Sequence, residues 1–164
     1  MVIQMKNKSI YIISFIWIVM DIIIKLIVKT NMNLYEKIVI IRNFFKIEYV
    51  LNDGAAFSSF SNMTIFLVIT SILVLIFLIN YLKNNNLDNK LETISFGIII
   101  GGITGNLIDR IIYKKVIDYL SFKIFGYDFA IFNFADIGIV VGILLLLIYY
   151  IGVEINGSKR RTKN

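Results

Sequence analysis

The sequence contains no cysteine, no histidine and no proline. Without cysteine, the chain has no disulfide, no thiol nucleophile and no thiolate metal site. Without histidine, Ser-His catalytic triads and HExxH zinc sites are excluded as well. Any hydrolytic chemistry must therefore rest on carboxylates, lysine, serine or threonine, or on a metal site made only of oxygen ligands.

Charged residues are few and apolar residues are many. Hydrophobic residues make up 58% of the chain, and the mean hydropathy of +0.80 exceeds that of ordinary soluble domains. The apolar residues come in long blocks and not at amphipathic spacing, which points to a lipid bilayer as the solvent. The net charge of +6 is ordinary for a membrane protein with cytoplasmic lysine and arginine, so we expect no nucleic-acid partner.

Four segments are long and apolar enough to span a membrane, at about residues 9–28, 62–82, 93–112 and 136–153. The predicted fold class is therefore an all-α membrane core, built as a single integral membrane domain over residues 1–164. The first segment resembles a signal peptide because two lysines precede it. However, no small-x-small cleavage site follows, and the apolar run continues beyond Asp21, so we interpret it as a retained helix.

Four spans place the loops at residues 29–61 and 113–135 on the same side of the membrane. Lysine and arginine are equally numerous on the two sides, so the positive-inside rule does not decide the orientation. The basic tail at residues 158–163 favours cytoplasmic N- and C-termini, which would put both loops on the extracytoplasmic side.

Both loops have strand-like patterns. Residues 45–49 alternate apolar and charged side chains, as in a half-buried strand, and can pair with residues 38–41. Residues 119–134 are rich in aromatics around Gly126, which is typical of extended structure with a turn. We therefore predict a small β-rich region lying on the membrane surface. Its aromatic rings fit an interfacial belt and contact with a substrate equally well.

Asp21 and Lys25 lie four residues apart, so they share one face of the first helix. Ionisable groups at this depth are costly and usually face a bundle interior or a wet cavity. The pair is either a brace beneath a functional site or a snorkelling pair near the helix end.

Two glycine-containing segments carry further polar residues. Asn52 and Gly54 form a turn just before the second span, which a simple structural turn would also explain. Gly101 and Gly105 form a small-xxx-small face for close helix packing. Asn106, Asp109 and Arg110 follow at positions i, i+3 and i+4, so they form one polar stripe at the membrane edge. The alternative is a packing motif that ends in a surface ion pair.

Asp118 lies in an apolar, strand-like stretch, and Asp136 lies where the fourth span begins. Asp136 is suited to capping that helix, which is the structural alternative to a chemical role. Two carboxylates that meet at an apolar surface cannot both ionise easily, so they share one proton. Such a pair can hydrolyse a peptide bond, with one carboxylate as base and the other as acid.

Five motif blocks, in this order, resemble lipoprotein signal peptidase, also called signal peptidase II, a family of bacterial membrane aspartic peptidases. The resemblance covers nearly the whole chain. The blocks are D-x-x-x-K at residues 21–25, N-x-G-A-A-F at 52–57, G-G-x-x-G-N-x-x-D-R at 101–110, V-x-D at 116–118 and F-N-x-A-D at 132–136. Ile22, Ile24 and Leu51 depart from residues that are common in the family.

The resemblance implies that Asp118 and Asp136 are the catalytic dyad. It implies substrate-binding or dyad-supporting roles for Asn52, Gly54, Asn106, Arg110, Asn133 and Ala135. It also implies structural support from Asp21, Lys25, Asp109, Gly101 and Gly105.

The same resemblance implies an aspartic endopeptidase that removes signal peptides from prolipoproteins. Cleavage would fall before the diacylglyceryl-modified cysteine, at the outer face of the bacterial cytoplasmic membrane. The resemblance implies no metal and no organic cofactor, contact with membrane lipids, and inhibition by the cyclic peptide globomycin. We expect a monomer.

Two other functions fit parts of the sequence. A small proton-coupled transporter would explain the pair of Asp21 and Lys25, but residues 62–82 and 137–153 carry no charge. A membrane assembly factor would explain the small-xxx-small packing faces at Gly101 and Gly105 and at Gly138 and Gly142. It gives no role to Asp118 and Asp136.

Overall fold

The computed structural model describes residues 8–54, 63–85, 87 and 89–161, with the backbone alone described from residue 156 on. In chain order the elements are α1 (Lys8–Asn31), β1 (Lys37–Ile41), β2 (Phe45–Asn52), α2 (Thr64–Asn84), α3 (Lys90–Tyr113), β3 (Val116–Ile124), β4 (Tyr127–Asp128) and α4 (Phe134–Arg161). The predicted fold class is confirmed, with four helices long and apolar enough to cross a membrane and a small antiparallel sheet.

The third helix, α3, lies in the middle of the bundle, and α1, α2 and α4 all pack against it. Its own apolar residues are therefore mostly buried, whereas α1, α2 and α4 turn large apolar side chains outward, among them Phe15, Ile65, Phe77 and Leu147. A surface that faces water does not expose so many large apolar side chains, but a surface that faces lipid does. The outer surface of the bundle is thus matched to a bilayer.

Close approach between α1 and α3 depends on small residues. A Cβ atom added at Gly101 would lie 2.7 Å from the Cβ atom of Trp17 and 3.0 Å from the backbone oxygen of Ser14. The Ser14 hydroxyl also donates a hydrogen bond of 2.9 Å to the carbonyl of Gly97. The small-xxx-small pattern in α3 therefore does what small residues do in membrane helices, which is to bring two backbones together.

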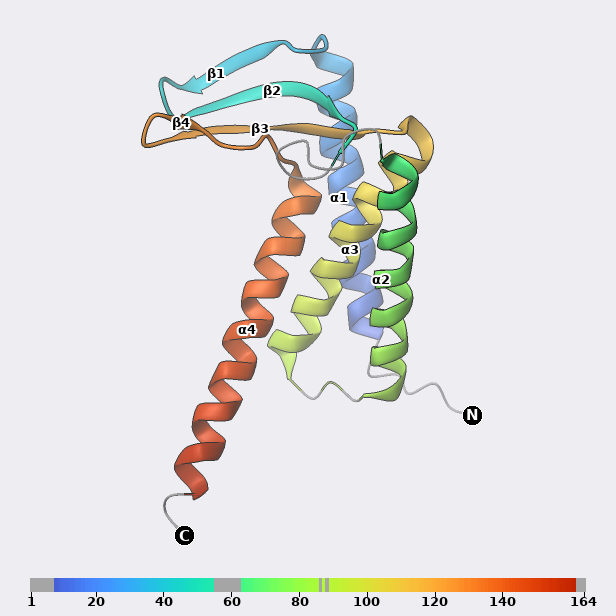
Figure 1. Ribbon diagram of the computed structural model, residues 1–164, viewed down its shortest axis with the longest axis vertical. Helices are drawn as coiled ribbons and strands as arrows, with labels where there is room; N and C mark the ends of the chain where they lie inside the picture. The colour runs from blue at the N-terminus through green and yellow to red at the C-terminus, as the bar shows by residue number, and fades with distance from the viewer. Residues whose placement is uncertain (1–7, 55–62, 86, 88, 162–164) are drawn as a thin grey trace.

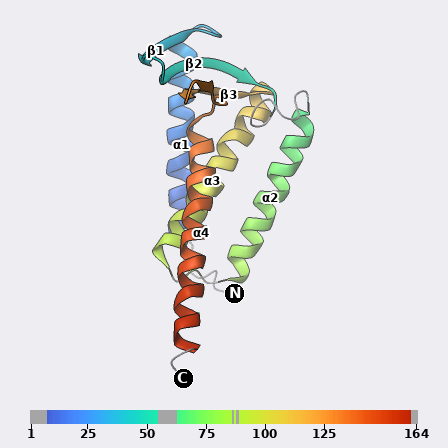
Figure 2. The same ribbon diagram turned by 60° about the vertical axis from the view of Figure 1, so that its left-hand side comes forward.

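The sheet covers one end of the bundle, where α1 and α3 end and α2 and α4 begin (Figures 1 and 2). Its strand order is β1-β2-β3-β4, and all neighbours are antiparallel. The expected pairing of the two segments in the first loop is present, with Ile38 opposite Ile47. The expected turn in the second loop is present at Gly126, which has a φ of 85°. Both loops therefore join one sheet at one end of the molecule.

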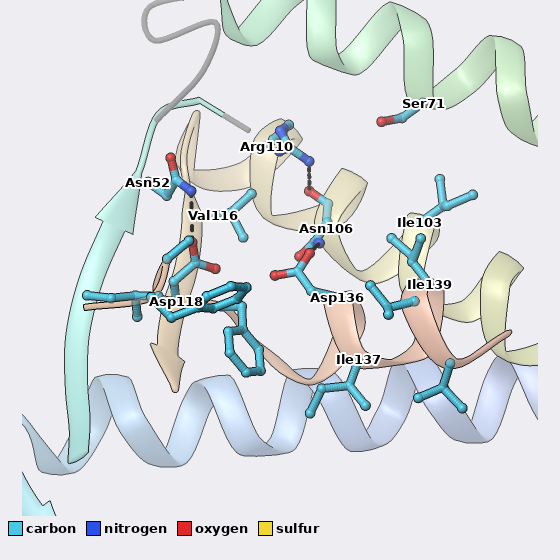
Figure 3. A pocket seen from close by; sticks show the side chains of 16 residues that line it. Asn52, Ser71, Ile103, Asn106, Arg110, Val116, Asp118, Asp136, Ile137 and Ile139 are labelled. Carbon is cyan, nitrogen blue, oxygen red and sulfur yellow. Dashed lines mark hydrogen bonds between the residues drawn. The ribbon is translucent and has the colours of Figure 1, made fainter. Parts of the chain in front are cut away.

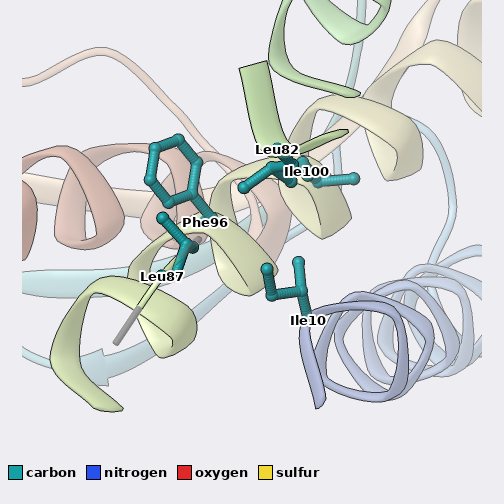
Figure 4. Close-up of a cluster of buried hydrophobic side chains, with 5 residues drawn as sticks. All are labelled: Ile10, Leu82, Leu87, Phe96 and Ile100. Atoms are coloured by element: carbon teal, nitrogen blue, oxygen red, sulfur yellow. The ribbon is translucent and has the colours of Figure 1, made fainter. Parts of the chain in front are cut away.

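Apolar clusters fix the two ends of the bundle. Beneath the sheet, Val28 of α1 packs with Tyr49, Ile117 and Tyr119 from β2 and β3. At the opposite end lies a second cluster (Figure 4), formed by Ile10, Leu82, Leu87, Phe96 and Ile100. The sheet is thus anchored to α1 by its own apolar face, which fixes the position of β3 relative to the helices.

Replacing Gly101 by alanine should push α1 and α3 apart, because the new methyl group meets Trp17 and the Ser14 backbone. We expect a loss of about 1–3 kcal/mol in stability, measured as a lower midpoint of thermal unfolding in detergent. Gly152→Ala is the matched control, since nothing lies within 4 Å of the added atom at that position. Equal midpoints for the two variants would contradict the close packing.

Candidate active site

Asp118 is the third residue of β3 and is almost fully buried, with 3% of its surface exposed. Its carboxylate accepts two hydrogen bonds from side-chain amides. Asn133 donates to one oxygen at 2.7 Å and Asn52 donates to the other at 2.9 Å. The expected strand around Asp118 is confirmed, and pairing with β2 holds it in register opposite Val50.

Asp136 lies in the first turn of α4, where it forms a capping box with Asn133. The Asp136 carboxylate accepts from the backbone N–H of Asn133 at 3.1 Å, and the Asn133 side chain accepts from the backbone N–H of Asp136 at 3.0 Å. Asn106 donates to the other carboxylate oxygen of Asp136 at 2.7 Å. The capping role weighed for Asp136 is therefore real, and Asn133 precedes the helix as its N-cap.

Asn133 joins the two aspartates. Its side-chain amide donates to Asp118 while its backbone N–H donates to Asp136, and it is completely buried. The two carboxylates face each other in the close view of the site (Figure 3). Burial and then the negative charge of Asp136 raise the pKa of Asp118 to about 7, against the hydrogen bonds from Asn52 and Asn133, which lower it. The structure thus brings together the two carboxylates that the sequence left unconnected.

A buried lysine lies directly behind this pair. Lys25 contacts Asp21 at 2.7 Å and Asp109 at 3.0 Å, and all three side chains are almost inaccessible. The snorkelling alternative for Asp21 and Lys25 is therefore wrong. The expected polar stripe on α3 also points inward at Asp109, which binds Lys25 of α1.

Each carboxylate beside Lys25 also holds the backbone next to one aspartate of the pair. Asp21 accepts from the N–H of Ala135 at 2.9 Å, and Ala135 immediately precedes Asp136. Asp109 accepts from the N–H of Ile117 at 3.1 Å, one residue before Asp118. Lys25 with its two carboxylates therefore fixes the backbone on both sides of the site.

Asn106 connects the lysine to the site. Its side-chain oxygen accepts from Lys25 at 3.0 Å and from Asn133 at 3.0 Å. Two donors on one atom leave the side-chain nitrogen of Asn106 as the group that donates to Asp136, so the orientation of the amide is determined by its neighbours.

Arg110 and Gly54 close the other side of the site. The Arg110 guanidinium donates to the carbonyl of Gly54 at 3.1 Å, and the Gly54 N–H donates to the Asn52 side chain at 2.9 Å. The turn expected around Asn52 is thus present and is linked to α3. Residues 55–57, the end of that motif block, lie outside the described residues.

A cavity of about 550 Å³ opens in front of the two aspartates, between α2, α3, α4 and β3 (Figure 3). Its polar end consists of Asn52, Asn106, Arg110, Asp118 and Asp136. The remaining lining is largely apolar: Ser71, Ile103, Val116, Phe129, Ala130, Ile131, Phe132, Ile137, Ile139, Val140 and Val141. Within the described ranges, no group of three or more carboxylates is placed to hold a metal ion.

A family model described as signal peptidase (SPase) II matches residues 13–152, which is most of the chain. This chain belongs to the signal peptidase II family. Proteins named lipoprotein signal peptidase are similar to it over most of both lengths. The one from Halothermothrix orenii is 41% identical over 85% of this chain and 93% of its own length. The one from Clostridium tetani is 38% identical over 85% and 90%.

Solved structures agree with this family assignment. One structure, described as a bacterial membrane enzyme, has a TM-score of 0.84 and 30% identity, over 93% of each chain. A second, described in the same words, has a TM-score of 0.79 and 31% identity, over 90% of this chain and 94% of the other. This signal peptidase II family member is thus a multi-pass membrane protein with the fold of known membrane enzymes.

Sequence reasoning missed one side chain that shapes the site. The Tyr119 hydroxyl accepts a hydrogen bond of 3.2 Å from the backbone N–H of Phe134, at the first residue of α4. Burial raises the pKa of Tyr119, so its hydroxyl stays neutral. The only sequence signal is a polar aromatic directly after Asp118. Tyr119 therefore belongs to the packed core of the signal peptidase and not to the exposed aromatics of the loop.

Replacing Lys25 by methionine should destabilise the protein by about 3–5 kcal/mol, because two buried carboxylates lose their counter-charge. The measurement is unfolding in detergent. Lys29→Met is the matched control one turn further along α1, where the exposed ammonium lies 4.0 Å from the Tyr113 ring and contributes about 0.5–1 kcal/mol.

A triple variant that also carries Asp21→Asn and Asp109→Asn should recover part of the stability lost in Lys25→Met. A triple variant less stable than Lys25→Met alone would argue against charge imbalance as the cause.

Proposed function

We propose that this chain is an aspartic endopeptidase that removes signal peptides from prolipoproteins, with Asp118 and Asp136 as its catalytic dyad. One observation carries the dyad assignment: the buried Asp118 and the half-buried Asp136 face one cavity and are joined by Asn133. Membership of the signal peptidase II family and the relatives named lipoprotein signal peptidase support the substrate class.

The surroundings of the two aspartates suggest a division of roles. Asp136 lies at the positive end of the α4 dipole and accepts from a backbone N–H and from Asn106, so it is the better-stabilised carboxylate. It is the base that takes a proton from the attacking water. Asp118, with a pKa raised to about 7, keeps its proton at neutral pH and donates a hydrogen bond to the scissile carbonyl oxygen.

Peptide hydrolysis by this pair needs no other group to carry a proton. Water adds to the carbonyl carbon as Asp136 accepts its proton, and the carbonyl oxygen takes the proton of Asp118. When the tetrahedral intermediate collapses, the proton held by Asp136 passes to the leaving amine while Asp118 regains its own. Both carboxylates then return to their starting states.

The polar residues around the dyad hold it or the substrate in place. Asn52, Asn106 and Asn133 keep the two carboxylates oriented through their amides. Arg110 lines the same cavity and is fixed by the Gly54 carbonyl, which suits it to positioning a carbonyl of the substrate. Ala135 contributes its backbone N–H to Asp21.

The apolar part of the cavity suits a lipid-modified substrate. Ile103, Ile139 and Val140 continue the lining from the dyad along α3 and α4. A diacylglyceryl-cysteine places acyl chains in the membrane directly beside the peptide bond to be cut, so both parts of the substrate would meet this cavity together. Globomycin, a cyclic peptide, would occupy the same space.

The sheet-bearing end would lie on the extracytoplasmic side of the bacterial cytoplasmic membrane, with both termini in the cytoplasm. The basic residues near the C-terminus, at 158–163, support this orientation. The chain would act as a monomer among membrane lipids, since one chain supplies both aspartates and the asparagines that hold them.

A proton-coupled transporter is less well supported. The buried lysine and its two carboxylates lie at the sheet end, and Glu92 lies at the other end bonded to Tyr150. Between Glu92 and Asp109, α3 carries no charged residue that would continue a proton path.

Asp118→Asn and Asp136→Asn should each reduce the turnover of a diacylglyceryl prolipoprotein by about a thousandfold, because each removes one half of the acid–base pair. The shape of the side chain is kept, so thermal unfolding should show a folded protein. Asp128→Asn, in the exposed strand β4, is the matched control and should retain activity. More than a tenth of normal turnover in either dyad variant would contradict the assignment.

Activity should fall as the pH rises above about 7, because Asp118 then loses the proton that it must donate. The stability of the fold should also decrease as the pH rises. A folded-state pKa raised above the ordinary value of 3.8 makes the fold lose stability as the pH rises from about 4 to 7.

The measurement is kcat/KM against pH, with unfolding midpoints of wild type and Asp118→Asn at the same pH values. A rate that stays constant to pH 9 would contradict a protonated Asp118.

A further inference from the structure

The segment between β4 and α4, residues 129–132, runs beside the far edge of β3. The Phe129 N–H donates to the carbonyl of Phe122 at 2.8 Å. Phe132 and Leu120 exchange two hydrogen bonds, of 3.1 and 2.8 Å. The segment is therefore bonded to β3 at both of its ends.

The two bonded ends are out of step by one residue. Between Leu120 and Phe122, β3 has one residue, Ser121, whereas the facing segment has two, Ala130 and Ile131. One extra residue on one strand is a β-bulge, which re-aims the backbone locally and is common beside active sites. Ser121 itself pairs with Lys46 on the other side of β3.

The bulge determines which backbone groups of this segment are hydrogen-bonded. In the part of the chain that the structure describes, no hydrogen bond engages the N–H or C=O of Ala130 or Ile131. Groups between two bonded positions of an antiparallel pair point away from the partner strand. Both residues line the cavity in front of the dyad. The cavity wall therefore carries an open sheet edge, next to the strand that holds Asp118.

We propose that the bulge at Ala130 and Ile131 binds the backbone of the substrate as an added strand. The extended peptide on one side of the scissile bond would exchange N–H···O=C hydrogen bonds with these two residues. The inference rests on the proposed peptidase function and assigns a binding site for the peptide main chain within it.

The backbone groups along this edge match a peptide better than they match an acyl chain. Donors and acceptors that alternate along an edge match an extended peptide, whereas acyl chains have no polar atoms to offer them. Backbone groups also need a partner when a substrate displaces water from a mostly apolar cavity, since an unpaired one is costly there. Binding through the main chain would accept many side chains, because neighbouring side chains of a strand point to opposite faces.

The test uses synthetic diacylglyceryl lipopeptides in which one backbone amide at a time is N-methylated. Each methyl group removes one donor of the substrate. With wild-type enzyme, kcat/KM should fall about five- to tenfold at positions that alternate along one side of the scissile bond. Methylation at the positions between them should change it less than twofold. An equal effect at all positions, or none at any, would overturn the added strand.

Failure of the two proposals can be told apart. If the unmethylated lipopeptide is not cleaved, the peptidase function itself is wrong. If it is cleaved in a dyad-dependent way but methylation shows no alternation, only the inference about the bulge is wrong.

Ile131→Pro gives an independent measurement on the enzyme, because proline has no N–H. It should lower kcat/KM about tenfold more than Ile131→Ala, which trims the side chain and keeps the N–H. Equal losses in the two variants would contradict a role for the backbone donor. The methylated substrates test the complementary bonds, from substrate N–H groups to the carbonyls of the bulge, with the wild-type chain, so the added strand can be tested even if the proline variant folds poorly.

Discussion

The ammonium group of Lys25 is the charge on which the site depends. It is buried in α1 between a carboxylate of the same helix, Asp21, and one of α3, Asp109. Moving charges out of water is expensive, and two carboxylates against one ammonium leave a net negative charge. Backbone N–H groups from β3 and α4 supply the remaining hydrogen bonds, at Ile117 and Ala135. Four elements are therefore tied to one lysine, and two of them carry the aspartates of the site.

The bilayer explains why so many polar groups gather at one end. In hydrocarbon every polar group must find a partner inside the protein, and the middle of the bundle is accordingly apolar or small. Near the membrane edge the sheet adds strands whose amides can serve as partners. The carboxylates that carry the proposed chemistry thus lie where the protein can stabilise them and where a lipid-held peptide bond would lie.

The asparagine side chains fix the orientation of the two aspartates. An amide has a donor end and an acceptor end, so a side chain that is held at one end presents the other in a fixed direction. Lys25 fixes Asn106, and Asn106 with the α4 capping box fixes Asp136. Asn133 in turn fixes the orientation of the Asp118 carboxylate through its side-chain amide. The cluster of Lys25, Asp21 and Asp109 therefore positions the two aspartates through neutral asparagine side chains.

The sequence by itself determined the features that follow from short-range periodicity. Apolar block lengths indicated the four helices, the number of spans placed the two loops at one end, and alternation indicated that residues 45–49 could pair with residues 38–41. The absence of histidine and cysteine reduced the chemistry to few side-chain types, and the motif blocks pointed to Asp118 and Asp136.

Only the tertiary structure decided which distant groups meet. Asp21 was predictable as a neighbour of Lys25 because four residues are one helical turn, but Asp109 reaches Lys25 only when α1 and α3 pack. The dual role of Asn133 and the bulge at Ala130 and Ile131 depend on how the last loop settles against β3. Local patterns describe one element at a time, and these contacts join elements whose relative positions are set by packing.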